Sequence, residues 1–289
     1  MTRTATAAAA LLLAALPLAG RAAPAPAAPA PAGPPPAAAD FAPIPEDNLI
    51  VMDTSKGRVV IELVPELAPE SVERIKVLSR QGFYDGLKFF RVIDDFMAQG
   101  GDPNNTGQGG STLPNLKGTF TFRTGPSGGA FVPLGKLPTG GDFGFIGAVP
   151  ASSQPGDLAL MMADGKVNGW GMFCAGVAGM ARAQDPDSAN SQFYLMRQIN
   201  SSLDRKYTPF GRVVQGLDVV RAIAVGEPPA APDAMTRVKV ASDLPPAEQP
   251  KLSRVRADSA YAKAMAAQAL AAGGADFTPC NLELPVRAN

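Results

Sequence analysis

The sequence predicts a mainly β fold, either an antiparallel barrel or a sandwich, on the basis of three observations. Short runs rich in β-branched residues recur along the chain, turns containing Gly or Pro separate them, and a single amphipathic helix follows the first strands. Strands joined by short turns pair antiparallel, whereas a parallel sheet needs a helical crossover between strands. The 289 residues are 46% hydrophobic, so the chain has enough apolar side chains for a large core.

The first two strands are expected to form a hairpin that leads into the helix. "NLIVMD" and "GRVVIELV" flank the turn "TSKG" at residues 54–57. In 68–82, Pro69 suits a first helical turn, and Val72, Ile75, Leu78 and Ser79 recur at helical spacing. Gly82 stands where a C-terminal cap is expected, so this segment is predicted to be a helix.

Further strands and one more helix are predicted downstream of this helix. The strand candidates are "LKFFRVI" (87–93), "SQFYLMR" (191–197), "FGRVV" (210–214) and "MTRVKVASDL" (235–244). The Ala-rich segment 254–272 predicts a helix near the C-terminus. Residues 111–178 carry many glycines and several prolines without a clear period, so we expect a long insertion there with at most a few short strands.

Composition predicts four parts of the chain. A signal peptide (1–23) and an Ala/Pro-rich linker (24–46) come first. A folded domain follows (47–242, with the insertion at about 111–178), and then a C-terminal extension with a helix (243–289). Arg3 and the apolar run 7–19 have the layout of a secretory leader, and Pro17 interrupts a run already too short to span a membrane. An uncleaved anchor is the alternative. We expect an exported protein, periplasmic or secreted, with no stable membrane span after processing.

The absence of histidine limits the chemistry that this chain performs. Without histidine there is no Ser-His-Asp or Cys-His catalysis, and the two cysteines are too few for a zinc ribbon. We therefore expect no metal and no cofactor. The 26 basic and 26 acidic residues form no dense basic stripe, so nucleic acid is not an expected partner. Cys174 and Cys280 form either a disulfide or two buried thiols.

The window 89–110 places Arg91 between large apolar side chains, a few residues before a glycine-rich loop. One interpretation is a buried strand that runs into a turn. The other is a binding cleft with one cation, Arg91, and one amide, Gln99, on an apolar floor. The loop lacks a following Gly-Lys-Ser/Thr and does not open a helix, which argues against a nucleotide site. Gln192 and Tyr194 lie two apart on a predicted strand and therefore share one face.

Three ordered motifs in this chain resemble the cyclophilin family of peptidyl-prolyl isomerases. They are "FYDGLKFFRVIDDFMAQGGDPNNTGQGG", "MARAQDPDSANSQFYLM" and "SSLDRKYTPFGRVVQGLDVV". The resemblance covers about 48–110 and 176–225. It implies a closed eight-stranded antiparallel β-barrel with capping helices and a substrate groove on its outer face.

The resemblance also implies a role for each matching residue. Arg91 matches the catalytic arginine, and Gln99 the glutamine that holds the substrate backbone. The remaining substrate-binding positions are Phe96, Met97, Ala181, Ala183, Gln192, Tyr194, Leu203 and Tyr207. The chain departs from the best-known members at four positions, with Phe90 and Tyr207 replacing histidines, Tyr194 replacing phenylalanine, and Ser202 replacing a tryptophan that contacts cyclosporin. We expect activity to persist and cyclosporin binding to be weak.

The expected function is cis-trans isomerisation of X–Pro bonds in proline-containing polypeptides and unfolded exported proteins by a monomer. The rotation needs no nucleophile, metal or general base, which suits a chain without histidine. The alternative is a catalytically weak chaperone or peptide-binding module whose insertion covers the groove. Arg91 would otherwise be an ion-pair partner of Asp94, Asp95 or Asp102. Trp170 is expected to pack a loop rather than to bind substrate.

Overall fold

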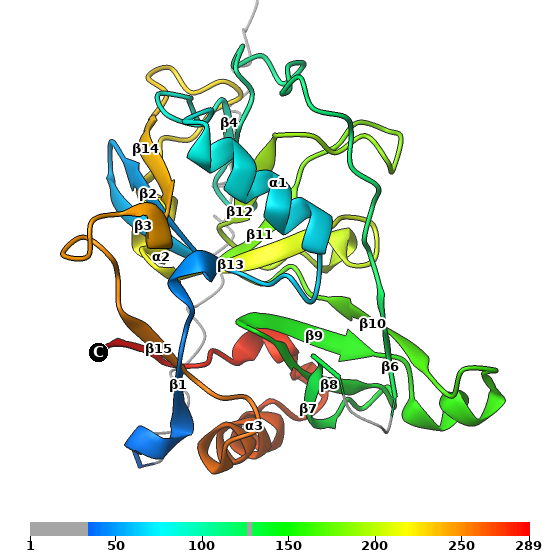
Figure 1. Cartoon of the computed structure of the whole chain (residues 1–289). Coiled ribbons are helices and arrows are strands. Elements are labelled where there is room, and N and C mark those ends of the chain that lie inside the picture. The colour runs from blue at the N-terminus through cyan, green and yellow to red at the C-terminus, as the bar shows by residue number, and fades with distance from the viewer. Residues whose placement is uncertain (1–33, 126–128) are drawn as a thin grey trace, which may run out of the picture.

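A curled antiparallel sheet of eight strands forms the main body of the protein (Figure 1). The computed structural model describes residues 34–125 and 129–289, so the expected signal peptide lies outside the described residues. The strand order is β14-β2-β3-β13-β11-β12-β5-β4. The bounds are β2 (Leu49–Thr54), β3 (Gly57–Leu63), β4 (Arg91–Ile93), β5 (Met97–Gly100), β11 (Val177–Met180), β12 (Phe193–Met196), β13 (Pro209–Gln215) and β14 (Met235–Val240).

The expectation of a closed barrel is slightly overstated. The edge strands β4 and β14 do not form a ladder with each other in the described chain. Isolated bridges, Lys88 to Ala234 and Val92 to Gly226, connect the segments beside the two edges instead. The strand predicted at 87–93 is shorter in the structure, where β4 covers Arg91–Ile93. Lys88 forms only an isolated bridge outside that strand.

The predicted hairpin and helix are confirmed. β2 and β3 pair from Leu49–Glu62 to Thr54–Gly57, and α1 (Pro69–Arg80) follows them. Val72, Ile75 and Leu78 are buried in the barrel's main core cluster. The chain turns away just after α1 at Gly82, whose φ of +68° favours glycine. A second, short helix, α2 (Leu217–Ala222), packs near β3.

The insertion is more ordered than its sequence predicts. It forms a five-stranded antiparallel sheet, β6-β10-β9-β8-β7, which lies below the barrel in Figure 1. The strands are β6 (Phe122–Thr124), β7 (Val132–Lys136), β8 (Asp142–Ile146), β9 (Val149–Ser153) and β10 (Val167–Gly171). Its glycines allow close approach of neighbouring strands: a Cβ atom on Gly144 would overlap the carbonyl oxygen of Val132. Trp170 lies on β10, and the Arg205 guanidinium stands 4.8 Å from its ring centre.

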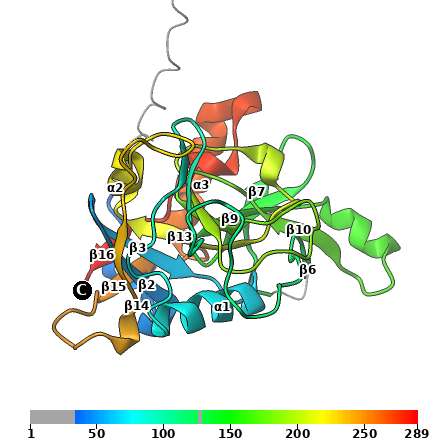
Figure 2. The same cartoon turned by 90° about the horizontal axis from the view of Figure 1, so that it is seen from above.

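The C-terminal extension supplies two strands of a third sheet, which lies against the barrel and beside the insertion sheet, and a helix that packs near β7 (Figures 1 and 2). β15 (Leu252–Val255) pairs with β1 (Phe41–Pro43) on one side and β16 (Val286–Ala288) on the other. Residues 41–43, assigned to the linker by composition, are thus a strand, and the ordered chain begins before Asp47. The predicted C-terminal helix begins later than expected, as α3 (Ala260–Gly273), because the Ser259 side chain accepts from the Ala262 N–H and caps it there.

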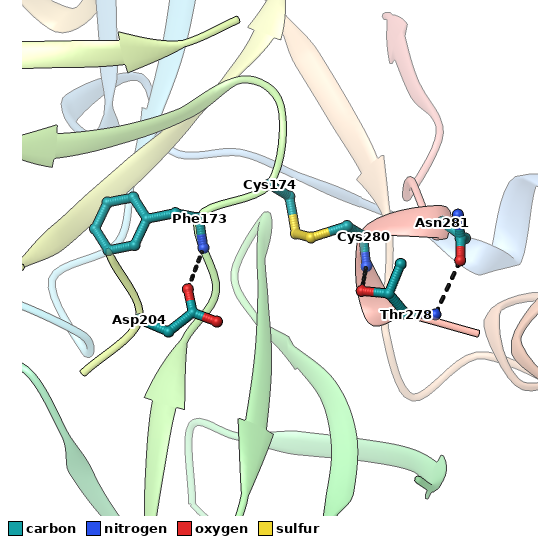
Figure 3. Close-up of a disulfide and its surroundings, with 6 residues drawn as sticks. All are labelled: Phe173, Cys174, Asp204, Thr278, Cys280 and Asn281. Atoms are coloured by element: carbon teal, nitrogen blue, oxygen red, sulfur yellow. Dashed lines mark hydrogen bonds between the residues drawn. A yellow bond between two sulfur atoms is a disulfide. The ribbon is translucent and has the colours of Figure 1, made fainter. Parts of the chain in front are cut away.

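A disulfide joins the end of the insertion to the extension (Figure 3). Cys174 and Cys280 are bonded, with a Cα–Cα distance of 5.1 Å, which decides between the two interpretations of these cysteines. Cys280 lies in the short η7 helix (Pro279–Asn281). No helix in residues 34–125 and 129–289 combines the length and the hydropathy that crossing a membrane requires.

Candidate active site

Three neighbouring strands bring Arg91, Gln99 and Tyr194 into one row. Arg91 on β4 is directly opposite Gln99 on β5, and Gln99 is directly opposite Tyr194 on β12. Directly opposed residues of an antiparallel pair project from the same face of the sheet. The row therefore places a guanidinium, an amide and an aromatic ring on one surface of the barrel.

A cavity of about 230 Å³ lies on this row and gathers most of the expected site residues. Its lining consists of Arg91, Phe96, Met97, Gln99, Ala181, Arg182, Tyr194, Leu203 and Tyr207. The remaining two expected residues, Ala183 and Gln192, line an adjoining cavity of about 630 Å³ together with the glycine loop 107–110. Gln99, Ala181 and Arg182 line both cavities, so the two form one continuous groove.

A chain of side-chain hydrogen bonds runs along the floor of this groove. Arg91 Nη1 donates to Gln99 Oε1 at 3.4 Å, and Gln99 Nε2 donates to Gln192 Oε1 at 3.0 Å. Gln192 Nε2 then donates to the carbonyl oxygens of Gly107 and Gly109, at 3.1 and 2.7 Å. The chain orients both amides, and it leaves the Nη2 side of the guanidinium available to a ligand.

The ion-pair partner of Arg91 is Glu227, a residue that the sequence did not suggest. Arg91 Nε donates to Glu227 Oε2 at 2.6 Å, and both side chains are substantially exposed. Asp94 instead pairs with Arg197 at 2.6 Å, and Asp102 binds backbone amides. The neighbouring bridge between Val92 and Gly226 explains how Glu227 arrives beside Arg91 across the nearly closed edge of the barrel.

The glycine loop after β5 is built around the Asp102 carboxylate. Asp102 accepts hydrogen bonds from the backbone N–H groups of Asn104, Thr106, Gly107 and Gly109. Although burial opposes ionisation, these four donors hold the pKa of Asp102 below its ordinary value. The amides that would hold a phosphate in a nucleotide-binding loop are therefore already bound to a carboxylate.

Aromatic rings and one further arginine form the wall of the 230 Å³ cavity. The Tyr194 ring lies 5.8 Å from Phe173 and 6.1 Å from Tyr207, measured between centroids. The Arg182 guanidinium stands 4.5 Å from the Tyr207 centroid and donates to the Lys206 carbonyl. Its place between the expected Ala181 and Ala183 is the one signal by which the sequence could have identified Arg182.

The buried hydroxyl of Tyr194 is the polar exception in this apolar wall. It has no hydrogen-bond partner in the described part of the chain, and burial raises the pKa of Tyr194 well above its ordinary value. The hydroxyl therefore stays neutral, and the ring acts mainly as an apolar surface.

Asp204 follows the cavity residue Leu203 directly, and its protonation makes the stability of the fold depend on pH. Its Oδ1 accepts a hydrogen bond from the Phe173 N–H at 2.9 Å (Figure 3). Burial raises the pKa of Asp204 from 3.8 to about 6, with the Phe173 amide and Arg205 opposing this shift. The folded state therefore retains a proton between these two pH values that the unfolded chain has released.

We expect the Asp204 contribution to favour folding fully below pH 3.8, and to decline as pH rises through about 6. Asp204→Asn keeps the acceptor for Phe173 without the charge. Its free energy of unfolding should exceed that of the parent by roughly 2 kcal/mol at pH 7.5 and match it near pH 4. Urea unfolding at both pH values measures this, with Asp276→Asn as an exposed control. A constant difference at the two pH values would contradict the assignment.

The chain is similar in sequence to known peptidyl-prolyl cis-trans isomerases. Residues 49–242 match the family model described as cyclophilin type peptidyl-prolyl cis-trans isomerase/CLD. A probable peptidyl-prolyl cis-trans isomerase of Brucella suis is 32% identical over 191 residues, which are 62% of this chain and 73% of that protein. The human peptidyl-prolyl cis-trans isomerase-like 1 is 32% identical over 190 residues, covering 64% of this chain and 87% of that protein.

One solved structure resembles nearly the whole chain. The crystal structure of cyclophilin AquaCyp293 from Hirschia baltica superimposes with a TM-score of 0.77 and 37% sequence identity, covering 86% of this chain and 92% of that one. The structural match covers 86% of this chain, a larger share than the residues 49–242 that the family model matches. The structural similarity therefore extends to parts of the chain outside the matched family region.

Proposed function

Because the chain belongs to the cyclophilin-type peptidyl-prolyl cis-trans isomerase family, we propose that Arg91 is the catalytic group and that the 230 Å³ cavity holds the proline ring. The single observation that carries this proposal is the shared lining: Arg91, Gln99 and the apolar side chains Phe96, Met97 and Leu203 all face one cavity. A proline ring requires an apolar slot, and its amide requires a donor at the rim of that slot.

Rotation about an X–Pro bond crosses a barrier of about 18–20 kcal/mol because twisting removes the C–N resonance. In the twisted amide the prolyl nitrogen regains a lone pair that accepts a hydrogen bond, whereas the planar ground state accepts one poorly. A guanidinium beside that nitrogen thus binds the transition state more strongly than the substrate. The apolar wall also removes water from the amide, which disfavours its more polar planar form.

Glu227 and Gln99 position Arg91 for this task. Each takes one guanidinium nitrogen, Nε and Nη1 respectively, so the plane of the guanidinium is held from two sides. Gln99 is in turn fixed by Gln192, and the peptide on either side of the proline is expected to run along the strip 181–183 between the two cavities. Holding the donor in place reduces the ordering cost of the catalytic hydrogen bond.

The geometry favours an accessible groove over the alternative of an occluded binding module. No residue of 111–178 lines the 230 Å³ cavity in the described chain, and only Ser111 and Asn115 of that range reach the adjoining one. The insertion sheet packs against the extension, where Phe143 and Phe145 share a core cluster with Val255, and against the barrel, where Ile146 and Val149 share one with Met97 and Tyr194. These contacts support a role for the insertion in packing behind the cavity rather than in covering it.

The direct test is an isomerisation assay on the purified protein. Exchange between cis and trans forms of a short X–Pro peptide, followed by NMR exchange spectroscopy, should accelerate well above the uncatalysed rate of one event in tens to hundreds of seconds. Peptide binding in the groove without acceleration would instead support the peptide-binding module.

We further propose that the protein acts on exported polypeptides in the periplasm or outside the cell. The leader-like residues 1–23 support this, as does the Cys174–Cys280 disulfide, a bond typical of oxidising compartments. Fractionation of cells that express the full chain checks it. An intact N-terminus in the cytosolic fraction would contradict it.

A further inference from the structure

Outside the groove, the barrel carries a buried arginine that makes no side-chain hydrogen bond to the residues that the structure describes. Arg212 on β13 is 6% exposed, and its Nε atom has no hydrogen-bond partner in the described part of the chain. It also takes part in no ion pair among the described residues. Burial lowers the pKa of Arg212 below its ordinary value, and the nearby charges of Glu283 and Glu62 oppose that shift without bonding to Arg212.

The expected partner of Arg212 is engaged elsewhere. Glu62 on β3 is directly opposite Arg212 in the sheet, so both side chains project from the outer face of the barrel. The buried Glu62 carboxylate instead accepts from Arg254 Nε, with the shorter contact of 2.9 Å to Oε2. Arg254 belongs to β15 of the extension. The docked extension thus leaves two guanidinium groups beside one buried carboxylate.

Arg212 and Arg254 line one cavity of about 350 Å³ where the barrel meets the extension. The other lining residues are Ala148, Val213, Val214, Glu283, Leu284, Pro285 and Val286. Glu283 is the one further charged residue of this lining, and its side chain is exposed. We call this space the junction cavity. It is distinct from the groove, because the two have no lining residue in common.

We infer that the junction cavity binds a small oxyanion, a carboxylate or a phosphate, between Arg212 and Arg254. The planar guanidinium presents paired N–H donors that match the two oxygens of such a group. The anion would supply the hydrogen-bonded partner that Arg212 lacks among the described residues. Because it contacts the barrel through Arg212 and the extension through Arg254, its binding stabilises the docked extension. This inference does not depend on the proposed isomerase mechanism.

The test is thermal unfolding of the full chain with increasing inorganic phosphate or acetate, with sodium chloride holding the ionic strength constant. A ligand at free concentration L that binds only the folded state stabilises it by RT ln(1 + L/Kd), so the unfolding midpoint rises with the logarithm of the anion concentration once that concentration exceeds Kd. We expect this logarithmic rise of the midpoint with at least one of the two anions. A rise with phosphate alone assigns a phosphate-type ligand, and a rise with acetate alone assigns a carboxylate.

Three variants make the test specific. Arg212→Gln should abolish the rise, and Arg58→Gln, which removes an exposed arginine on β3, should leave it intact. Glu283→Gln should lower the anion Kd fitted to the midpoint rise severalfold, because it removes a negative charge from the cavity lining. It also reports on the site if Arg212→Gln fails to fold.

Two results would overturn the inference. Equal midpoint shifts in the parent and in all three variants would mean an adventitious ion only. No shift in the parent, together with a lower midpoint for Glu283→Gln, would mean that Glu283 itself turns inward and pairs with Arg212.

Discussion

Arg91→Ala is expected to lower kcat/KM for X–Pro isomerisation by more than tenfold while the protein stays folded. Removal of one donor aimed at charge that develops in a transition state costs roughly 10²-fold in rate. Arg91 is substantially exposed, and its contacts are Glu227 and Gln99 rather than the core. Its loss should therefore change the unfolding midpoint little. NMR exchange spectroscopy on a short X–Pro peptide, with far-UV circular dichroism alongside, measures both quantities.

Two matched variants separate catalysis from general effects at this site. Arg91→Lys keeps the charge but loses the planar fork that Glu227 and Gln99 hold, so its rate should resemble that of Arg91→Ala. Arg182→Ala removes the other arginine of the cavity wall and should change KM more than kcat, because Arg182 packs on Tyr207 and donates to the Lys206 carbonyl, whereas Arg91 is the proposed donor to the prolyl nitrogen. If Arg91→Ala turned over substrate at the parent rate, the proposed mechanism would be wrong.

The parts of the fold that the sequence predicted are those in which local pattern and tertiary contact agree. The hairpin β2–β3 alternates β-branched residues around a Gly turn, and α1 has an apolar face between Pro69 and Gly82. The site was found through three motifs, because its residues fall in short clusters: Arg91 to Gln99 on β4, β5 and the turn between them, and Gln192 and Tyr194 at β12 much later in the chain.

The features that the sequence missed depend on distant segments. Glu227 lies 136 residues from Arg91, in a Gly/Pro-rich stretch, and only the bridge at the barrel's open edge brings them together. The insertion strands contain Pro133, Gly144 and Gly169, residues that lower strand propensity. They form a sheet because the extension, through the Phe143 cluster, gives that sheet a second layer to pack against.

That second layer is tied to the rest of the protein by the disulfide, and its loss is expected to destabilise the chain strongly. Cys174 and Cys280 are 106 residues apart. In the chain-entropy model, closing a loop of this length stabilises the folded state by about 4–5 kcal/mol. Cys174 is fully buried beside Phe173 and Tyr194, so the double variant should carry alanine at both positions and not serine, whose hydroxyl would be buried at position 174.

We therefore expect Cys174→Ala/Cys280→Ala to unfold at a midpoint about 10 °C lower than the oxidised parent. Reduction of the parent with dithiothreitol should lower its midpoint similarly, and the same reductant should leave the double variant unchanged. Because Arg91, Gln99 and Tyr194 lie on strands that the bond does not join, isomerisation by the folded variant at 25 °C should stay within a few-fold of the parent. A midpoint loss of only a degree or two would show that packing around Phe143 and Val255 holds the extension without the bond, and a large loss confirms that the bond does.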